Sequence, residues 1–293
     1  MRRACGRVHS IRENAEETFR VEKVRREEQM SFLQKILDVK KEEVSELRSK
    51  FTRESFRSAD MYGKRRLSLE NALSDKTKIN IIAEVKKASP SKGILKNNFD
   101  HVAIAESYME CGADAISVLT DKQFFQGNIS FLREIAEKKT IPILRKDFII
   151  DEFQILEAKA HGADAVLLIA ETLSTQQINE LTIVAEENDL EVLLELHSVM
   201  QLEKIDFTQN KIIGINNRDL ETFKVNIKTT EEIVKQLPHD VLIVSESGIN
   251  SEVVLDQLKK INVNAVLVGE HFMKSDNIEK SLKEFAGWCK HES

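Results

Sequence analysis

The sequence predicts a single (β/α)8 barrel (a TIM barrel) with an N-terminal helical extension, and three observations favour this α/β fold. Eight short apolar runs follow residue 80, amphipathic segments of helical length separate them, and within the runs apolar residues stand next to one another instead of alternating with polar ones. Strands that alternate with helices build a parallel sheet, and continuous apolar strands suit a sheet that is covered on both faces. Eight such units are the number that closes a barrel.

The N-terminal part of the chain differs from the rest. Residues 1–29 are rich in Arg and Glu and poor in apolar residues, which predicts a disordered or marginally helical tail. The tail contains too many acidic residues for a transit peptide and lacks the apolar core of a secretory signal. Residues 30–293 are predicted to form the barrel, with extra helices over about 30–75.

The first extra helix is indicated by apolar side chains that fall on one helical face, with Lys and Glu elsewhere. These side chains are Leu33, Ile36, Leu37, Val44 and Leu47. A second, shorter helical stretch covers about residues 67–73. Because an apolar face must be covered, we expect the first helix to lie against the barrel, at its mouth or at its floor.

Eight strands are predicted, one for each apolar run. In chain order they are residues 81–85, 115–119, 141–145, 165–169, 191–196, 211–216, 241–246 and 265–269. The segments CGADAISVL and HGADAVLLI, at 111–119 and 161–169, have nearly the same sequence. Gly112 and Gly162 each follow a predicted helix, where glycine accepts the left-handed conformation that ends it. We therefore assign the repeat to architecture rather than to chemistry.

Composition and charge exclude several classes of function. The net charge of −6 argues against a general nucleic-acid binder or a protein of acidic membrane surfaces. The longest purely apolar run, residues 165–170, is too short to span a bilayer. The three cysteines have no close spacing, so they predict free thiols in a reducing, cytoplasmic environment. The histidines show no spacing typical of a metal site.

Ionisable or amide side chains end five of the predicted strands. Side chains two apart in a strand share a face, and barrel active sites lie at the carboxyl ends of the strands. The residues concerned are Glu84, Lys86, Lys146, Glu195, Asn216, Arg218 and Glu246. Charges of both signs at one mouth shift each other's pKa values, which suits acid–base chemistry. The alternative is an ion-pair network that only closes the top of the barrel.

Small residues follow the last two predicted strands. Ser247 and Gly248 come after the seventh strand, and Gly269 ends the eighth. Loops at these places in a barrel frequently bind phosphate through backbone N–H groups, and glycine lets the backbone approach the phosphate closely. The positions predict a phosphate site, with ordinary turn glycines as the alternative.

Six segments, in the same order, resemble the indole-3-glycerol phosphate synthases, which are barrel enzymes of tryptophan biosynthesis. They are IIAEVKKASPSKG (81–93), SVLTDKQFFQG (117–127), PILRKDFI (142–149), GINNRDLETF (214–223), VSESGI (244–249) and VLVGEHFM (266–273). The resemblance implies a carboxy-lyase that converts 1-(2-carboxyphenylamino)-1-deoxy-D-ribulose 5-phosphate to indole-3-glycerol phosphate, CO2 and water. It implies neither a metal nor an organic cofactor, and we expect a monomer or weak homo-oligomer.

Matching of motifs implies roles for the polar residues. Lys146 corresponds to the general acid of ring closure. Glu195 corresponds to a base, or to a group that stabilises positive charge at the substrate nitrogen. Lys86 would pair with an anionic group of the substrate and serve in dehydration, with Glu84 beside it. Asn216 would orient the reacting part of the substrate. Which acid serves which proton transfer stays open at this point.

The resemblance also implies the substrate contacts. An apolar slot for the aromatic ring would be lined by Pro90, Phe125, Phe148, Leu168, Leu220 and Leu267. Polar ends of the ligand would be held by Ser89, Arg218, Glu246, Ser247, Gly248 and Gly269, with Ser247, Gly248 and Gly269 at the phosphate. Glu270 comes next in the chain, and a carboxylate that pointed at the phosphate would repel it. We therefore expect the Glu270 side chain to turn to solvent.

Two other functions fit a phosphate-binding barrel. One is a different enzyme, such as a sugar-phosphate isomerase, and the other is a barrel kept as a scaffold or ligand-binding module. The EVKKASPSKG and RKDF segments count against the first. The second predicts loss of polar residues at the strand ends, whereas the whole set is present.

Overall fold

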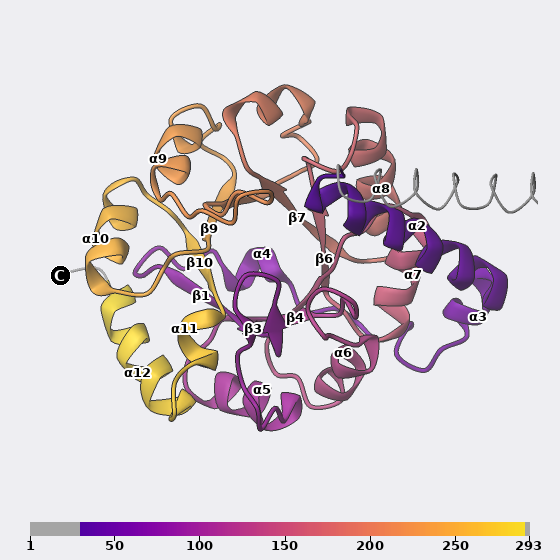
Figure 1. Ribbon diagram of the computed structural model, residues 1–293, viewed down its shortest axis with the longest axis horizontal. Coiled ribbons are helices and arrows are strands. Elements are labelled where there is room, and N and C mark those ends of the chain that lie inside the picture. Colours follow the sequence, from indigo (N-terminus) through magenta and orange to yellow (C-terminus); the bar gives the residue numbers. More distant parts are fainter. Residues whose placement is uncertain (1–29, 291–293) are drawn as a thin grey trace, which may run out of the picture.

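The computed structural model describes residues 30–290, so the prediction for residues 1–29 lies outside the described part of the chain. The described part contains a closed barrel of eight parallel strands with helices around it, and the predicted fold class is confirmed. Figure 1 looks along the barrel, with the strands at the centre and the helices in a surrounding ring.

The barrel strands agree with the predicted runs to within two residues at each end. They are β1 Asn80–Val85, β4 Ala115–Leu119, β5 Ile143–Lys146, β6 Ala165–Ile169, β7 Glu191–Leu196, β8 Ile212–Asn216, β9 Leu242–Glu246 and β10 Ala265–Val268. The barrel closes where β1 pairs with β10, with Ile82 opposite Leu267. The loop after β1 contains a small hairpin that was not predicted, formed by β2 (Ala88–Ser89) and β3 (Gly93–Ile94).

The outer helices follow the strands in alternation. They are α5 His101–Glu110, α6 Ile129–Ala136, α7 Glu152–Ala160, α8 Thr175–Glu187, α9 Lys228–Val234, α10 Glu252–Lys260, α11 Glu270–Met273 and α12 Ile278–Cys289, with a 3-10 helix η1 at Val199–Lys204. Asp100, Asn128 and Asp151 begin three of them by accepting hydrogen bonds from first-turn N–H groups. Gly112 and Gly162 have φ of +99° and +85° just after α5 and α7, so both have the left-handed conformation that was predicted for them.

The N-terminal extension packs against both ends of the barrel. It consists of α2 Phe32–Lys50, α3 Arg53–Arg57, which was not predicted, and α4 Leu69–Ala72. Leu73, just after α4, is buried in the barrel interior, and its carbonyl accepts from Asn80 at the start of β1, so α4 covers the floor. Ile36 of α2 is buried in the same interior cluster but lines the cavity at the opposite end. The helix α2 therefore lies at the mouth.

The apolar side chains form an inner and an outer layer. Leu144, Leu193 and Val244 belong to the inner cluster that fills the barrel. A larger cluster packs between the strands and the surrounding helices. Because side chains alternate along a strand, the inner residues fix which strand-end side chains face the mouth. No helix within residues 30–290 is long and apolar enough to cross a membrane.

Candidate active site

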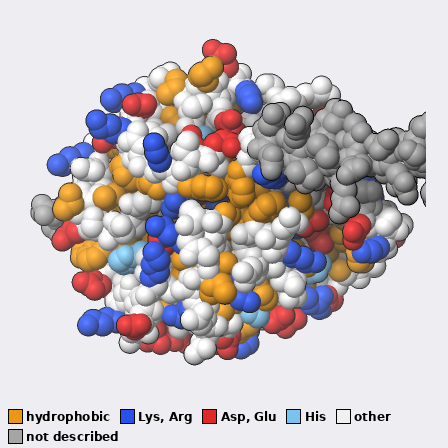
Figure 2. Space-filling view, viewed as in Figure 1, with side chains coloured by type: hydrophobic (Ala, Val, Ile, Leu, Met, Phe, Trp, Pro, Cys, Tyr) orange, Lys and Arg blue, Asp and Glu red, His pale blue; other side chains and the backbone are white. Residues whose placement is uncertain are grey.

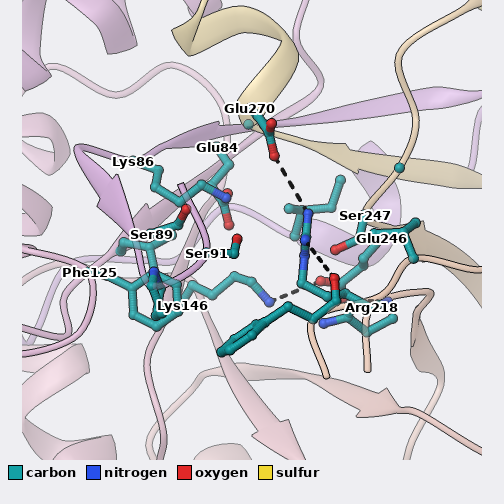
Figure 3. A pocket seen from close by; sticks show the side chains of 18 of the residues that line it. Glu84, Lys86, Ser89, Ser91, Phe125, Lys146, Arg218, Glu246, Ser247 and Glu270 are labelled. Atoms are coloured by element: carbon teal, nitrogen blue, oxygen red, sulfur yellow. Dashed lines mark hydrogen bonds and ion pairs between the residues drawn. The ribbon is translucent and has the colours of Figure 1, made fainter. Parts of the chain in front are cut away.

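A cavity of about 700 Å³ opens at the carboxyl ends of the strands. Figure 3 shows charged side chains from several strands that meet inside it. It brings together all but one of the predicted site residues: Glu84, Lys86, Ser89, Pro90, Phe125, Lys146, Phe148, Glu195, Asn216, Arg218, Leu220, Glu246, Ser247, Gly248, Leu267 and Gly269.

Leu168 is the exception, and the prediction that it lines the ring slot is wrong. Its side chain belongs to the outer cluster, between β6 and the helices. Its neighbours Leu167 and Ile169 face the barrel interior and line the cavity. The predicted position is off by one residue, and because side chains alternate along a strand, that shift places the side chain on the other face of the sheet.

Lys146 lies at the centre of the charged residues. Its Nζ atom is 2.7 Å from Glu195 Oε2 and 2.9 Å from Glu246 Oε2, and both carboxylates are buried. A second pair, Lys86 with Glu84, comes from the end of β1. Three carboxylates thus share one region with two ammonium groups, and an uncompensated negative charge remains if all five are ionised.

These neighbours shift the pKa values in opposite directions. Burial alone would lower the pKa of Lys146, but the carboxylates of Glu195 and Glu246 outweigh it and raise that pKa. Burial would raise the pKa of Glu195, but Lys146 and His197 lower it well below its ordinary range. Burial raises the pKa of Glu246 to about 8, and the nearby Glu195 adds to the rise. The ammonium and the Glu195 carboxylate are therefore ionised at neutral pH, whereas Glu246 takes up a proton readily.

The raised pKa of Glu246 predicts a pH-dependent stability. The group binds its proton more tightly in the folded state than in the unfolded state, where its pKa is near 4.5. Its contribution to the free energy of unfolding is complete below that value and is lost as pH rises towards 8. Between pH 5 and pH 8, we expect wild type to lose on the order of 1–3 kcal/mol more than Glu246→Gln.

Urea unfolding at the two pH values measures this difference. The exposed Glu279→Gln serves as the matched control, and it should follow wild type. Equal pH dependence in wild type and Glu246→Gln would show that Glu246 is ionised in the folded protein.

Asn216 and Arg218, at and beyond the end of β8, connect the charged centre to the rim of the cavity. The Asn216 side chain donates to Glu195 Oε1 (3.1 Å) and accepts from the backbone N–H of Arg218 (3.0 Å). The Arg218 guanidinium donates to the carbonyl of Phe223 (3.2 Å). His197 Nε2 lies 3.2 Å from Glu195 Oε1, a contact that we did not predict. Glu195 is thus held from three sides in one orientation.

Glu270 does not turn to solvent, and that prediction is wrong. One carboxylate oxygen accepts from Lys274 (2.6 Å), and the other lies 3.5 Å from the Arg218 guanidinium. Figure 3 shows the side chain directed into the cavity towards Arg218. The two cations, which also line the cavity, stabilise the carboxylate in this inward position.

The loop after β9 has a special backbone. Ser247 and Gly248 have φ of +66° and +80°, so two successive residues adopt the left-handed conformation. A side chain on Gly248 would collide with Val225. At Gly269, a Cβ atom would occupy the space of the Glu84 carboxylate, which is a second reason for glycine beside the predicted approach to phosphate.

Aromatic and aliphatic side chains also line the cavity. The rings of Phe125 and Phe148 lie 6.3 Å apart. Phe32 of α2 also lines the cavity, and its ring packs edge-on against Phe124 and Phe223. Figure 2 shows apolar side chains, in orange, gathered across the middle of this face of the molecule.

Several lining residues were missed by the sequence analysis. They include Phe32, Ile36, Lys92, Phe223 and Lys274. Lys92 lies inside the segment IIAEVKKASPSKG and could have been found there. Phe32 precedes Ile36 by one helical turn, so the apolar face of α2 contained the signal. Within residues 30–290, no group of three or more His, Cys, Asp or Glu side chains is arranged to hold a metal ion.

Comparisons of the sequence with known proteins find a matching family. A family model described as indole-3-glycerol phosphate synthase matches residues 33–285. The indole-3-glycerol phosphate synthase of Acetivibrio thermocellus is 47% identical over 219 residues, which are 75% of this chain and 84% of that protein. The one from Priestia megaterium is 44% identical over 258 residues, 87% and 97% of the two chains.

Solved structures of low identity share the fold. The 3-hexulose-6-phosphate synthase of Salmonella typhimurium superposes with a TM-score of 0.59 at 13% identity and covers 72% of this chain and 98% of its own. The N-(5'-phosphoribosyl)anthranilate isomerase of Pyrococcus furiosus gives 0.53 at 14% identity, with 72% and 98% covered. At these identities the likeness concerns the barrel alone.

Proposed function

This chain belongs to the indole-3-glycerol phosphate synthase family, and from that membership we propose how its own residues carry out the reaction. The enzyme is a carboxy-lyase that closes the indole ring in tryptophan biosynthesis. Ring closure joins an aromatic carbon to the substrate ketone, and CO2 and water then leave. The observation that carries the assignment of roles is the position of Lys146 between two buried carboxylates at the centre of the cavity.

Lys146 is the general acid of ring closure. The ketone oxygen becomes a strong base as the new carbon–carbon bond forms, and it needs a proton at that moment. The raised pKa of Lys146 keeps the ammonium charged until such a base arrives. Glu195 and Glu246 hold the ammonium in place, so the donor is oriented before the substrate binds.

Glu195 stabilises positive charge at the substrate nitrogen and does not act as a base. A carboxylate whose pKa is lowered well below the ordinary range is a poor proton acceptor but a lasting negative charge. Asn216 and Lys146 fix its two oxygens. The structure thus favours one of the two roles that the sequence left open.

Glu195→Gln tests this assignment. The amide keeps the shape of the side chain and loses its charge, so we expect kcat to fall about tenfold, which corresponds to about 1.4 kcal/mol. The dissociation constant of the product indole-3-glycerol phosphate, measured by fluorescence titration, should change much less. A variant with normal kcat and weakened product binding would contradict the role in charge stabilisation.

Lys86 and Glu84 serve the later steps. Their paired side chains lie on β1 and just beyond it, on the opposite side of the cavity from Glu246 in Figure 3. The ammonium can neutralise the carboxylate that leaves as CO2, and the pair can remove and supply the protons of dehydration. Ser89, next along this loop, would contact a polar part of the substrate.

The phosphate end of the substrate lies towards the rim. Ser247, Gly248 and Gly269 supply backbone in this region, and Arg218, Lys92 and Lys274 supply positive charge. The aromatic end lies in the slot formed by Pro90, Phe125, Phe148, Leu220 and Leu267 together with the inward Leu167.

The pairing of Glu270 with rim cations predicts that its charge opposes substrate binding. Glu270→Gln removes a negative charge beside the phosphate and frees Arg218 and Lys274. Two unit charges about 4 Å apart interact by roughly 1 kcal/mol in water, so KM should fall about threefold to tenfold. Steady-state kinetics at low ionic strength measures it, and Glu279→Gln is the exposed control. A raised KM would show that the carboxylate helps binding, for example by orienting Arg218.

Cellular setting and assembly are part of the same proposal. The buried thiols of Cys111 and Cys289 are free, which suits a reducing cytoplasm. The net charge of −6 argues against a nucleic-acid partner. We propose a monomer or weak homo-oligomer whose partner is the phosphorylated substrate, and light scattering of the purified enzyme checks the assembly state.

A further inference from the structure

A buried lysine on α2 has no role in the chemistry described above. Lys40 is only 1% exposed. Its Nζ atom lies 2.8 Å from Asp121 Oδ2, 2.8 Å from Asp147 Oδ1 and 2.8 Å from Glu43 Oε2. The two aspartates are buried as well, and they follow β4 and β5. One ammonium group therefore joins the N-terminal helix to two strand-end loops.

Each aspartate also organises the loop that contains it. Asp121 Oδ1 accepts from the backbone N–H groups of Phe124 (2.7 Å) and Phe125 (3.1 Å). Asp147 Oδ1 accepts from the backbone N–H of Phe148 (2.8 Å). The carboxylates that Lys40 holds are thus the same groups that fix the backbone at the two phenylalanines of the ring slot.

The position of Lys40 therefore affects the width of the slot. The rings of Phe125 and Phe148, 6.3 Å apart, come from the two loops that the ammonium brings together. Asp147 directly follows Lys146, so the same contact also bears on the end of β5. Without the ammonium, the buried carboxylate of Asp121 would lose its described ion-pair partner, and that of Asp147 would keep only Arg145, 3.3 Å from its Oδ2.

A purely stabilising role would not call for such a group. Burying an ion pair costs desolvation that its attraction often fails to exceed, so a buried charge cluster is weak evidence for stability. Burial disfavours the charge of Lys40, yet Asp147 and Asp121 raise its pKa above the ordinary value, and the ammonium persists. A charge retained at this cost, between two loops of the cavity, indicates a role in geometry.

We propose that Lys40 is a positioning residue that holds the loops after β4 and β5 at the separation that the aromatic ring of the substrate requires. The proposal rests on the proposed ring slot between Phe125 and Phe148.

Four single variants and one double variant test it, with kcat, KM and Tm measured for each. Lys40→Met removes the ammonium, and we expect KM to rise about tenfold while kcat falls less than threefold, because ring binding is lost equally before and in the transition state. Lys41→Met is the matched control, since Lys41 is the exposed next residue and pairs only with Asp38 among described groups. It should match wild type in all three quantities.

Phe125→Leu tests the slot separately from Lys40. It should raise KM about tenfold if the ring lies there. Lys40→Met/Phe125→Leu should then be little worse than either single variant, because both changes damage the same contact. A normal KM in Phe125→Leu would reject the slot itself, whatever Lys40 does.

Lys40→Arg covers the case in which Lys40→Met fails to fold. It keeps the positive charge but replaces the compact ammonium with a longer planar group, so we expect a Tm near that of wild type and a KM raised several-fold. A merely structural role predicts a lowered Tm with normal KM and kcat at 25 °C. That result in Lys40→Met, or normal kinetics in Lys40→Arg when Lys40→Met does not fold, would overturn the proposal, as would full additivity in the double variant.

Discussion

Lys146→Ala is expected to lower kcat by about 10²–10⁴, the usual contribution of a positioned general acid. The side chain sits between Glu195 and Glu246, and no other described lysine or arginine lies within ion-pair distance of these two carboxylates. Lys86 is paired with Glu84, so we do not expect it to replace Lys146 as the proton donor to the ketone oxygen. The loss should therefore appear in kcat, with KM changed much less.

Two further variants separate proton donation from charge. Lys146→Arg keeps the positive charge but does not release its proton at a useful pH, so it should be nearly as slow as Lys146→Ala. Lys138→Ala removes an exposed lysine that pairs with Glu106 and should be normal. Turnover close to wild type in Lys146→Arg would show that Lys146 acts only through its charge. Turnover close to wild type in Lys146→Ala would show that Lys146 takes no part in the reaction.

The ion-pair network that only closes the barrel top, which the sequence left as an alternative, fits the structure poorly. A network built for stability would pair each carboxylate with a cation. Here three carboxylates share two ammonium groups, and burial raises the pKa of Glu246 to about 8. The charged groups also face an open cavity of about 700 Å³ rather than a filled plug. An unfavourable charge balance next to an open cavity is typical of a catalytic site.

The strand ends could be predicted because polar residues mark which side chains face inward. Glu84 with Lys86, and Asn216 with Arg218, occur two apart at the ends of apolar runs, which fixes the parity of each strand. The run 165–169 is apolar throughout, so nothing in it distinguishes the inner from the outer face. The choice of Leu168 over Leu167 failed there for that reason.

Contacts between distant segments could not be predicted from local patterns. The apolar face of α2 indicated that the helix is covered, but not that Phe32 reaches the cavity or that Lys40 meets two strand-end aspartates. The direction of Glu270 depends on Arg218 and Lys274, and only the first belongs to another strand end. Periodicity reports which face of an element is buried, whereas partners across the barrel follow from closure of the fold.

Gly269→Val is expected to lower kcat/KM by about 10²-fold, because small displacements of reacting groups cost that much. Gly269 has φ of −125°, so its backbone does not demand glycine. Glycine is needed because there is no room for a side chain: a Cβ atom at this position would meet the carboxylate of Glu84. A branched side chain must push Glu84 away, and Lys86, which pairs with it, loses its orientation.

Gly63→Val is the matched control for this substitution. A Cβ atom at Gly63 has open space around it, so this variant should keep wild-type kinetics. The division between kcat and KM in Gly269→Val decides between two reasons for the glycine. Displacement of Glu84 and Lys86 lowers kcat, because the pair serves proton transfer, whereas obstruction of a backbone contact with phosphate raises KM alone. We expect the first pattern, and a rise in KM with normal kcat would show that contact with the phosphate is the main reason for this glycine.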